Sequence, residues 1–306
     1  MSLIVITLLR GLHYVHYVRL LWQSLRQQVI WAAPQPLIAL RHRVPRHLAV
    51  VLVADATWSE TETESCLLQS VKNAVEWCRA AGIQKLTVYE EHGKLFKFSW
   101  NIRDMLDDAS NGYPCKLLWN KDPMKPLESN HDWSRSMSPS FHPPLDMHTV
   151  VFVTGVFNEK MKPGQPIPQQ EREFSICLAS RKSSKPAIAS IADWLKEQHK
   201  RAVCPKTGEF TLTCDTLGSL LESEDILSAP DSLIVHPLNP LSYNWTPTEL
   251  HGYPPWQIRL TEICHNRVLF PWSMLILTRG APVPFDELTF RRALDEYAAA
   301  EMRFGK

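Results

Sequence analysis

The stretch His47–Tyr89 decides the fold, because it contains two apolar strands with a helix between them. It opens with HLAVVL (47–52), a short run of branched apolar residues that is typical of a strand buried on both faces. It closes with LTVY (86–89), a second run of the same kind. Strand, helix and strand in that order predict an α/β fold with a parallel sheet.

The segment between these two strands predicts one long helix. Thr57 and Glu60 have the spacing of a capping box, and the acidic residues that follow suit the positive end of a helix dipole. From Leu67 to Cys78 the apolar residues recur at helical spacing, and Gly82 stands where a helix ends. We therefore expect the segment to be helical from its capping residue to Gly82.

The remaining sequence continues the α/β pattern with one interruption. Further strands are predicted at 150–153, 174–179 and 232–235, and further helices at 98–110, from Pro186 onward and at 285–303. Prolines, polar residues and charges dominate most of the stretch after the first of these helices. A low-complexity insertion is therefore predicted at about 111–172, within a single domain that spans 44–306.

The first 33 residues form a basic, amphipathic arm. Six arginines and no acidic residue precede Asp55, whereas the rest of the chain has a small acidic excess. Aromatic and aliphatic residues interleaved with arginines suit the headgroup region of a bilayer, so we predict that 1–33 associates with a membrane surface. A helix packed on the body or on a partner is one alternative, and a spanning helix is another. Two prolines mark 34–43 as a linker.

Generic sequence motifs of enzymes and metal sites are absent. The sequence contains no GxGxxG, GxxxxGK(S/T), HExxH or GxSxG pattern. Its seven cysteines form no CxxC pair, and their odd number does not suit a disulfide framework. We therefore expect this chain to bind neither a metal ion nor a cofactor of its own.

Four segments carry a resemblance to a known family. Val44–Val51 (VPRHLAVV) is similar to an opening strand P-x-H-V/L-A-I/V-I/V, and Gly82–Tyr89 (GIQKLTVY) is similar to the second strand of the same family. Pro230–Ile234 (PDSLI) resembles a strand P-D-L-L-I, and Pro255–Glu262 (PWQIRLTE) resembles the segment W-Q-x4-E that follows it. In this order and spacing they resemble the cis-prenyltransferases, which are the undecaprenyl and dehydrodolichyl diphosphate synthases. The resemblance implies their fold, a mainly parallel central sheet flanked by helices.

Two places depart from the catalytic members of that family. Those members end the first strand in D-G-N, whose Asp helps to hold magnesium and the allylic diphosphate, where this sequence has Val53, Ala54 and Asp55. After the fifth strand they carry R-x-S/G-G-E, which binds isopentenyl diphosphate, where this sequence reads VHPLN from Val235. A valine neither coordinates a hard cation nor balances a diphosphate. The resemblance thus implies a chain that is inactive alone, with Mg²⁺ in a partner's active site.

The same departures resemble the accessory branch of the family, the Nogo-B receptor and its fungal counterparts. The matching segments are Tyr89–Lys94 (YEEHGK), Lys185–Ile188 (KPAI), Trp256–Ile263 (WQIRLTEI) and Tyr297–Lys306 (YAAAEMRFGK). The resemblance marks four of their residues as interface or family-motif positions: Trp256, Arg259, Glu262 and Tyr297. It also implies that Arg303 and Gly305 reach into the partner's active site and bind isopentenyl diphosphate there, with Phe304 and Lys306 as the supporting tail.

The residue types of the tail suit this role. The guanidinium of Arg303 is a fork of donors that matches a diphosphate. Gly305 lacks a Cβ, so its backbone N–H is able to approach a phosphate oxygen closely. Composition alone would also fit a solvated tail behind a basic helix end.

The resemblance implies an essential, non-catalytic subunit of a heteromeric cis-prenyltransferase. The complex would extend farnesyl diphosphate with isopentenyl diphosphate to dehydrodolichyl diphosphate, for dolichol synthesis and protein glycosylation. The implied partners are a catalytic cis-prenyltransferase subunit, both diphosphates at the shared site and a membrane surface, with no nucleic acid. The implied location is the endoplasmic reticulum membrane, with the body facing the cytoplasm. Two alternatives remain: a non-enzymatic membrane scaffold or lipid-binding receptor, and a self-sufficient homodimeric enzyme that recruits Asp55.

Overall fold

The computed structural model describes most of the body and short pieces of the N-terminal arm. The described residues are 7–12, 14–16, 18–19, 33–54, 58–108, 116–119, 149–154, 174–201, 213, 218, 227–239, 249–265 and 282–300. Asp55 and the C-terminal residues Arg303, Phe304, Gly305 and Lys306 lie outside these ranges.

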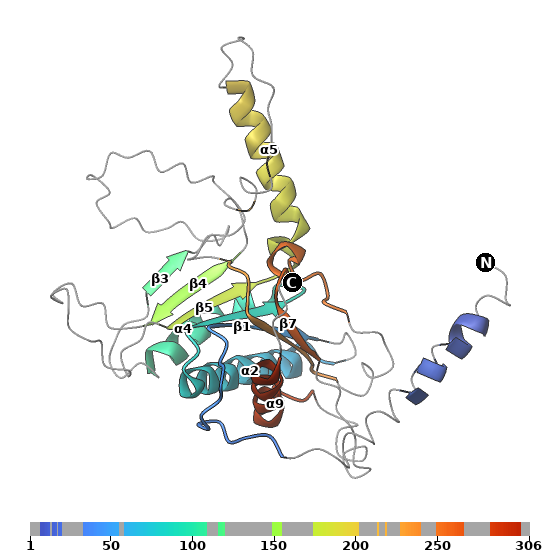
Figure 1. Cartoon of the computed structure of the whole chain (residues 1–306). Coiled ribbons are helices and arrows are strands. Elements are labelled where there is room, and N and C mark those ends of the chain that lie inside the picture. The colour runs from blue at the N-terminus through green and yellow to red at the C-terminus, as the bar shows by residue number, and fades with distance from the viewer. Residues whose placement is uncertain are drawn as a thin grey trace.

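Seven strands form one sheet in the order β3-β4-β5-β2-β1-β6-β7 (Figure 1). The strands are β1 (His47–Val53), β2 (Lys85–Glu90), β3 (Lys116–Trp119), β4 (Val150–Thr154), β5 (Phe174–Ala179), β6 (Ser232–Pro237) and β7 (Glu262–His265). The neighbours β5, β2, β1, β6 and β7 all pair in parallel, whereas β4 is antiparallel to both β3 and β5. The predicted α/β fold with a mainly parallel sheet is therefore confirmed.

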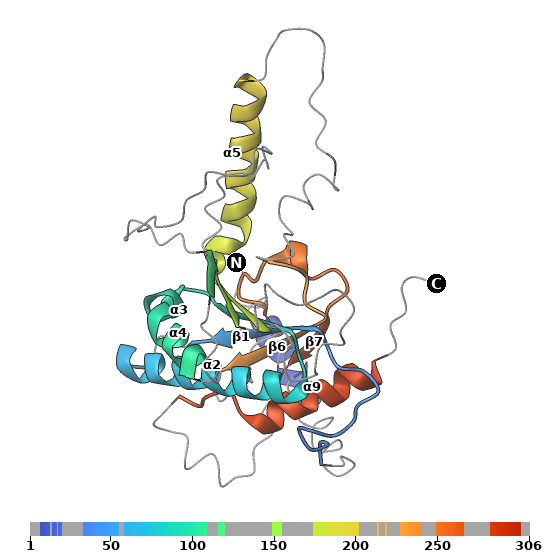
Figure 2. The same ribbon diagram turned by 90° about the vertical axis from the view of Figure 1, so that its left-hand side faces the viewer.

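Helices cover one face of the sheet, and a further long helix projects from the opposite side. The described helices are α2 (Glu60–Ala81), α3 (Lys94–Lys97), α4 (Ser99–Asp108), α5 (Lys185–Arg201) and α9 (Glu287–Ala299), with 3-10 turns η2 (Arg181–Ser183) and η3 (Pro255–Gln257). In Figures 1 and 2, α2 and α9 lie together on one face, while α5 extends away from the opposite side of the sheet. The single helix predicted at 98–110 is observed as α4, preceded by the short α3.

Helix α2 begins two residues later than its sequence suggested. Its N-cap is Ser59, whose hydroxyl accepts a hydrogen bond from the Glu62 N–H at 3.3 Å and donates one to the Glu62 carboxylate at 2.6 Å. Thr57, which we expected as the cap, lies outside the described residues. At the other end the helix stops at Gly82, as predicted; Gly82 has φ 76°, and Ile83 N–H donates to Cys78 O at 2.9 Å in a Schellman-type turn.

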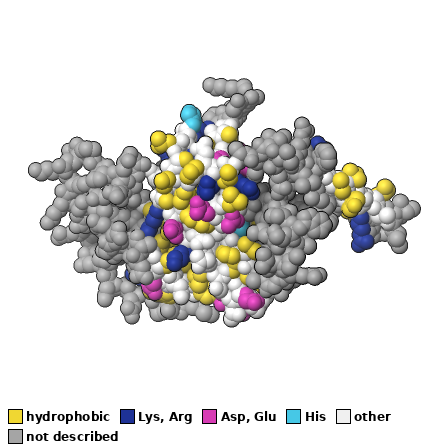
Figure 3. Space-filling view, turned by 90° about the horizontal axis from the view of Figure 1, so that it is seen from below, with side chains coloured by type: hydrophobic (Ala, Val, Ile, Leu, Met, Phe, Trp, Pro, Cys, Tyr) yellow, Lys and Arg dark blue, Asp and Glu magenta, His cyan; other side chains and the backbone are white. Residues whose placement is uncertain are grey.

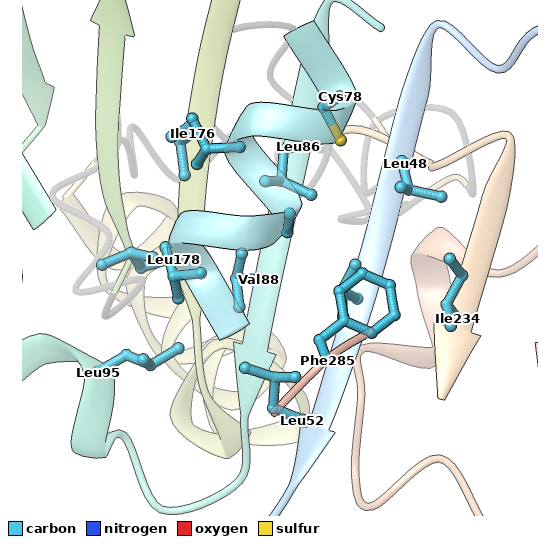
Figure 4. Close-up of a cluster of buried hydrophobic side chains, with 14 of the residues drawn as sticks. Leu48, Leu52, Cys78, Leu86, Val88, Leu95, Ile176, Leu178, Ile234 and Phe285 are labelled. Atoms are coloured by element: carbon cyan, nitrogen blue, oxygen red, sulfur yellow. The ribbon is translucent and has the colours of Figure 1, made fainter. Parts of the chain in front are cut away.

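The main core lies between the sheet and helices α2, α4 and α9. Strand side chains that point to this face include Leu48, Leu86, Ile176 and Ile234, and Phe285 lies over them (Figure 4). Strand β1 contributes alternate residues to this core and to a second one on the other face, which contains Ala49, Val51 and Tyr89. Because β1 is buried on both sides, its sequence is a continuous apolar run rather than an alternating one.

The outer surface over α2 and α9 mixes all types of side chain. In Figure 3, which views the molecule from below Figure 1, hydrophobic, basic and acidic groups are interspersed on the described part of this face. Leu288, at the start of α9, is 45% exposed. Scattered exposure of this kind is normal for a protein surface and carries no functional argument by itself.

Two strands lie inside the interval that we expected to be a low-complexity insertion. Strands β3 and β4 fall within 111–172, and β4 joins the sheet by pairing with β5. Val151 and Phe152 of β4 are buried, as their short apolar run predicts. The polar residues on either side of this run gave no indication that β4 pairs with β5. The other residues of 111–172 lie outside the described part of the chain.

Residues 34–43, expected as a linker, are attached to the body. The Arg41 guanidinium donates to Asp295 on α9 at 2.8 Å, and the Arg41 side chain is only 2% exposed. The Arg291 side chain donates in turn to the backbone oxygens of Gln35 and Pro34. This segment is therefore a strap that runs across α9, and we refer to 34–43 as the strap below.

The described pieces of the arm are helical, and their apolar side chains are exposed. Leu8, Leu12 and Val15 are each more than 60% exposed, so these residues do not pack on the body. Within the described residues, no helix has the length and apolar character that a bilayer crossing requires. Association of the arm with a membrane surface remains a prediction.

A buried histidine at the start of β1 predicts a pH-dependent stability. His47 Nδ1 lies 3.1 Å from Ala229 O, a group that can only accept, so this nitrogen carries the proton and Nε2 accepts from the Thr87 hydroxyl at 2.8 Å. Burial, together with the nearby charge of Lys85, lowers the pKa of His47 from 6.5 to about 3. Between these two pH values the unfolded chain binds a proton that the folded chain does not.

We therefore expect the free energy of unfolding to fall as the pH falls from 6.5 towards 3. Replacing His47 by Gln should reduce the loss between pH 7 and pH 5 by about 2 kcal/mol, measured by chemical denaturation. The exposed His42 provides a matched control through His42→Gln. An equal pH dependence in wild type and His47→Gln would contradict this assignment.

Candidate functional site

The carboxyl ends of the parallel strands meet at one edge of the sheet, where α/β proteins place their ligands. At the centre of this edge β1 and β6 end together, and their register pairs Val53 with Pro237. Val53 is partly buried against the second core, and Leu238 N–H donates to Val53 O at 2.9 Å. The centre of the edge is therefore built from aliphatic side chains and a proline.

The second position singled out from the sequence lies deeper than the first. Val235 is fully buried in β6 and pairs with Val51, two register positions before Val53. Its neighbour His236 points to the other face, where its ring contacts Phe285 and its Nε2 lies 3.2 Å from Val283 O. Burial lowers the pKa of His236, so this ring is neutral in the folded protein. Pro237, rather than Val235, is the residue that stands beside Val53.

The apolar side chains at this edge do not fit a diphosphate–magnesium site. Mg²⁺ takes oxygen ligands in octahedral geometry, and the side chains of Val53, Ala54 and Pro237 offer none. In the described part of the chain, no group of three or more His, Cys, Asp or Glu residues is placed to hold a metal ion. The position of Asp55 is not described, so the alternative in which it replaces the missing carboxylate is untested.

Charged side chains gather next to this apolar centre, at the end of β2. The Glu91 carboxylate accepts a hydrogen bond from Arg181 at 2.5 Å and lies 3.7 Å from His251 Nδ1. The Tyr89 hydroxyl donates to His251 O at 2.8 Å, which ties the same loop to the strand. Burial raises the pKa of the Tyr89 hydroxyl, so it stays a donor at neutral pH.

The turn that follows β2 is held by a buried carboxylate. Glu90 is 1% exposed and accepts hydrogen bonds from the N–H groups of His92 at 3.1 Å and Lys94 at 2.6 Å. Gly93 has φ 72°, which lets the chain turn directly into α3. The charged groups at this end of the sheet thus bond to one another and to the backbone. They brace the edge.

Three of the four interface or family-motif residues lie on opposite faces of the sheet. Trp256 packs against Ala187 and Ile191 of α5, and the Arg259 guanidinium lies 5.0 Å from the centre of the Trp256 ring. Tyr297 is buried on α9, on the other face, with the Arg43 guanidinium 5.2 Å from its ring centre. The structure therefore joins Trp256 to Arg259 and keeps this pair apart from Tyr297.

Glu262 opens β7 and connects three motif segments through the backbone. Its N–H donates to Asp231 O at 3.0 Å, while the Asp231 carboxylate accepts from the N–H groups of Arg46 at 2.7 Å and His47 at 3.0 Å. The starts of β1, β6 and β7 are thereby joined at the amino edge of the sheet. The role of Asp231 is visible only in the fold, because its two donors lie about 185 positions earlier in the chain.

The sequence missed most of the bracing network for the same reason. Arg181 and Glu91 are 90 positions apart, and His251 comes from a third segment. The one available signal was YEEHGK, which marked Glu91 and Gly93 without their partners. The tail residues Arg303, Phe304, Gly305 and Lys306 lie outside the described residues, so their predicted role is untested.

The fold and the apolar edge agree with the resemblance found in the sequence. A mostly parallel sheet with flanking helices is consistent with the cis-prenyltransferase fold that the sequence segments indicated, here with an apolar β1–β6 edge. No family model matches the chain. The chain is similar to a curated protein of Schizosaccharomyces pombe, dehydrodolichyl diphosphate synthase complex subunit nus1, with 24% identity over 267 residues. The match covers 85% of this chain and 77% of that protein, and it confirms the resemblance to such accessory subunits.

Two glycines with the same backbone conformation provide a stability test of the turn after β2. Gly82 and Gly93 have φ 76° and 72°, but an added Cβ would meet nothing within 4 Å at Gly82 and would lie 3.1 Å from the Phe96 ring at Gly93. Gly82→Ala should cost only the left-handed backbone term of about 1–2 kcal/mol. Gly93→Ala should cost more, because the ring must also move. Equal losses in chemical denaturation would show that the turn is not tightly packed.

Proposed function

We propose that this chain is a non-catalytic subunit of a dehydrodolichyl diphosphate synthase complex. The observation that carries the proposal is the Val53–Pro237 pair at the edge where the cis-prenyltransferase fold has its substrate site. The sheet and its helices remain, while Val53 and Val235 stand where catalytic members have the Asp and the Arg that bind diphosphate and magnesium. The similarity to a complex subunit over 85% of the chain points in the same direction.

On this proposal the chemistry takes place in a catalytic partner. There Mg²⁺ would neutralise the diphosphate that leaves when farnesyl diphosphate condenses with isopentenyl diphosphate. This chain contributes donors from its C-terminal tail: the Arg303 guanidinium pairs with diphosphate oxygens, and the Gly305 N–H approaches them closely. Fixed donors of this kind stabilise charge most effectively in a site that excludes water. Phe304 and Lys306 hold the tail in place.

The body and the arm have separate roles in this proposal. The bonded network of Glu91, Arg181 and His251 braces the sheet edge without contacting substrate. Exposed apolar side chains such as Leu12 and Val15, interleaved with arginines, associate with an anionic membrane surface. The complex is placed at the endoplasmic reticulum membrane with the body in the cytoplasm, where it makes the dehydrodolichyl diphosphate needed for dolichol and protein glycosylation.

The first test is incorporation of isopentenyl diphosphate into long polyprenyl diphosphates from farnesyl diphosphate. The full chain alone should show none, and the purified complex with its catalytic subunit should be active. Activity of the chain alone would favour the homodimeric enzyme that recruits Asp55. Inactivity of the purified complex would favour a scaffold or lipid-binding receptor.

The second test concerns the tail. Arg303→Ala should lower the turnover of the complex by about a hundredfold, the typical effect of removing one preorganised donor, without preventing assembly. Lys72→Ala removes an exposed positive charge on α2 and is the matched control, expected to behave as wild type. Equal turnover for both variants would overturn the role assigned to the tail.

A further inference from the structure

The C-terminal helix α9 is held from two sides. One side packs into the main core through Phe290 and Leu294. The other side is crossed by the strap, residues 34–43, which comes from the opposite end of the sequence. A helix that only needed to complete the core would not require this second set of contacts.

The strap and helix α9 are joined by a set of hydrogen bonds centred on Arg41 and Asp295. Asp295 accepts from Arg41 Nε at 2.8 Å through one carboxylate oxygen and from Gln35 N–H at 2.8 Å through the other. The remaining donors of Arg41 bond back to the strap, at Gln35 O (3.0 Å) and Leu37 O (3.1 Å). Arg41 therefore fixes the shape of the strap and its attachment at once. Its fork of donors is needed for this, since a single ammonium would not reach all three acceptors.

Two further contacts extend the attachment along the helix. Arg291, one turn before Asp295, donates to Gln35 O at 2.7 Å and to Pro34 O. Arg43 lies with its guanidinium over the Tyr297 ring, 5.2 Å from the ring centre. The strap thus contacts α9 at Arg291, Asp295 and Tyr297. The last of these residues is in the final turn of the helix.

The contacts between the strap and α9 end close in sequence to the C-terminal tail, residues 301–306. Helix α9 stops at Ala299, and Ala300 is already extended with φ −67° and ψ 127°. Tyr297 precedes Arg303 by only six positions. Any rotation or tilt of the last turn of α9 would be carried directly into the start of the tail, because few bonds separate them.

We infer that the strap is a positioning element for the C-terminal tail, with Arg41 and Asp295 as its central residues. It sets the direction in which residues 301–306 leave α9 and so determines where the donors of the tail arrive in the partner's active site. The inference rests on the proposed role of Arg303. Arg41 and Asp295 act through α9 and contact no substrate.

The experiment measures KM for each substrate in the purified complex that contains the full chain. Arg41→Ala should leave assembly intact and raise KM for isopentenyl diphosphate by about tenfold, since misplacement of a binding group by about 1 Å has effects of up to a hundredfold. KM for farnesyl diphosphate should stay within about twofold, because only the tail's site for isopentenyl diphosphate is disturbed. Arg41→Lys should restore part of the affinity through the single bond to Asp295.

A surface ion pair elsewhere provides the matched control. Lys97 and Glu60 pair at 2.9 Å with both side chains more than 60% exposed, on α3 and α2. Lys97→Ala also removes one cation and one ion pair, and it should leave both KM values unchanged. Asp295→Asn carries the same test as Arg41→Ala if the alanine variant does not fold.

A double variant separates positioning from mere stabilisation. In an Arg303→Ala background, Arg41→Ala should not raise KM for isopentenyl diphosphate any further, because the group that it positions is already gone. If the strap variants lower the melting temperature but leave this KM equal to that of Lys97→Ala, the strap only holds the fold and the inference is wrong. If Arg303→Ala itself has no effect, the proposed role of the tail fails instead, and the inference fails with it.

Discussion

The structure depends on the burial of one strand, β1, between two parallel neighbours and two cores. Its backbone is paired with β2 on one side and β6 on the other, and its side chains alternate between a core under α2 and α9 and a core on the opposite face. A shift of one residue in β1 would move every side chain to the wrong core, so the apolar run from Leu48 to Val53 fixes both pairings together. That register in turn places Val53 against Pro237 and gives the candidate site its character.

Local patterns were sufficient for the elements that form this centre. The branched run of β1, the heptad-like stripe of α2 and the run of β5 each predict their element because burial on one or two faces leaves a regular signature. The patterns failed where burial is partial or pairing is remote. Strand β7 escaped prediction because Ile263 is exposed at the sheet edge while Cys264 is buried, so four residues give no clear period. The attachment of the strap was invisible, since Arg41 and Asp295 are 254 positions apart and each looks like an ordinary surface charge.

The candidate site could be predicted from the sequence only in part, for a related reason. The absence of a carboxylate at Val53 can be read from the sequence, but the residue that lies beside Val53 depends on the strand register, which places Pro237 there. The charges nearby acquire their meaning only from their partners. Glu91 meets Arg181 and His251 from two other segments, which makes it a brace. The role of such residues depends on their tertiary contacts, which composition and spacing along the chain do not reveal.

The pairing of Val53 with Pro237 also bears on how such a chain evolves. If an ancestor carried a carboxylate and an arginine at this edge, their loss is difficult to reverse one step at a time. An aspartate introduced at position 53 would lie partly buried against Val51 and Val235 with no cation to balance it, which is unfavourable by several kcal/mol before any benefit appears. An arginine at position 235 would be fully buried in the same apolar core. Each reversion is harmful without the other, so under the proposed function the apolar edge would keep the lineage dependent on a second subunit.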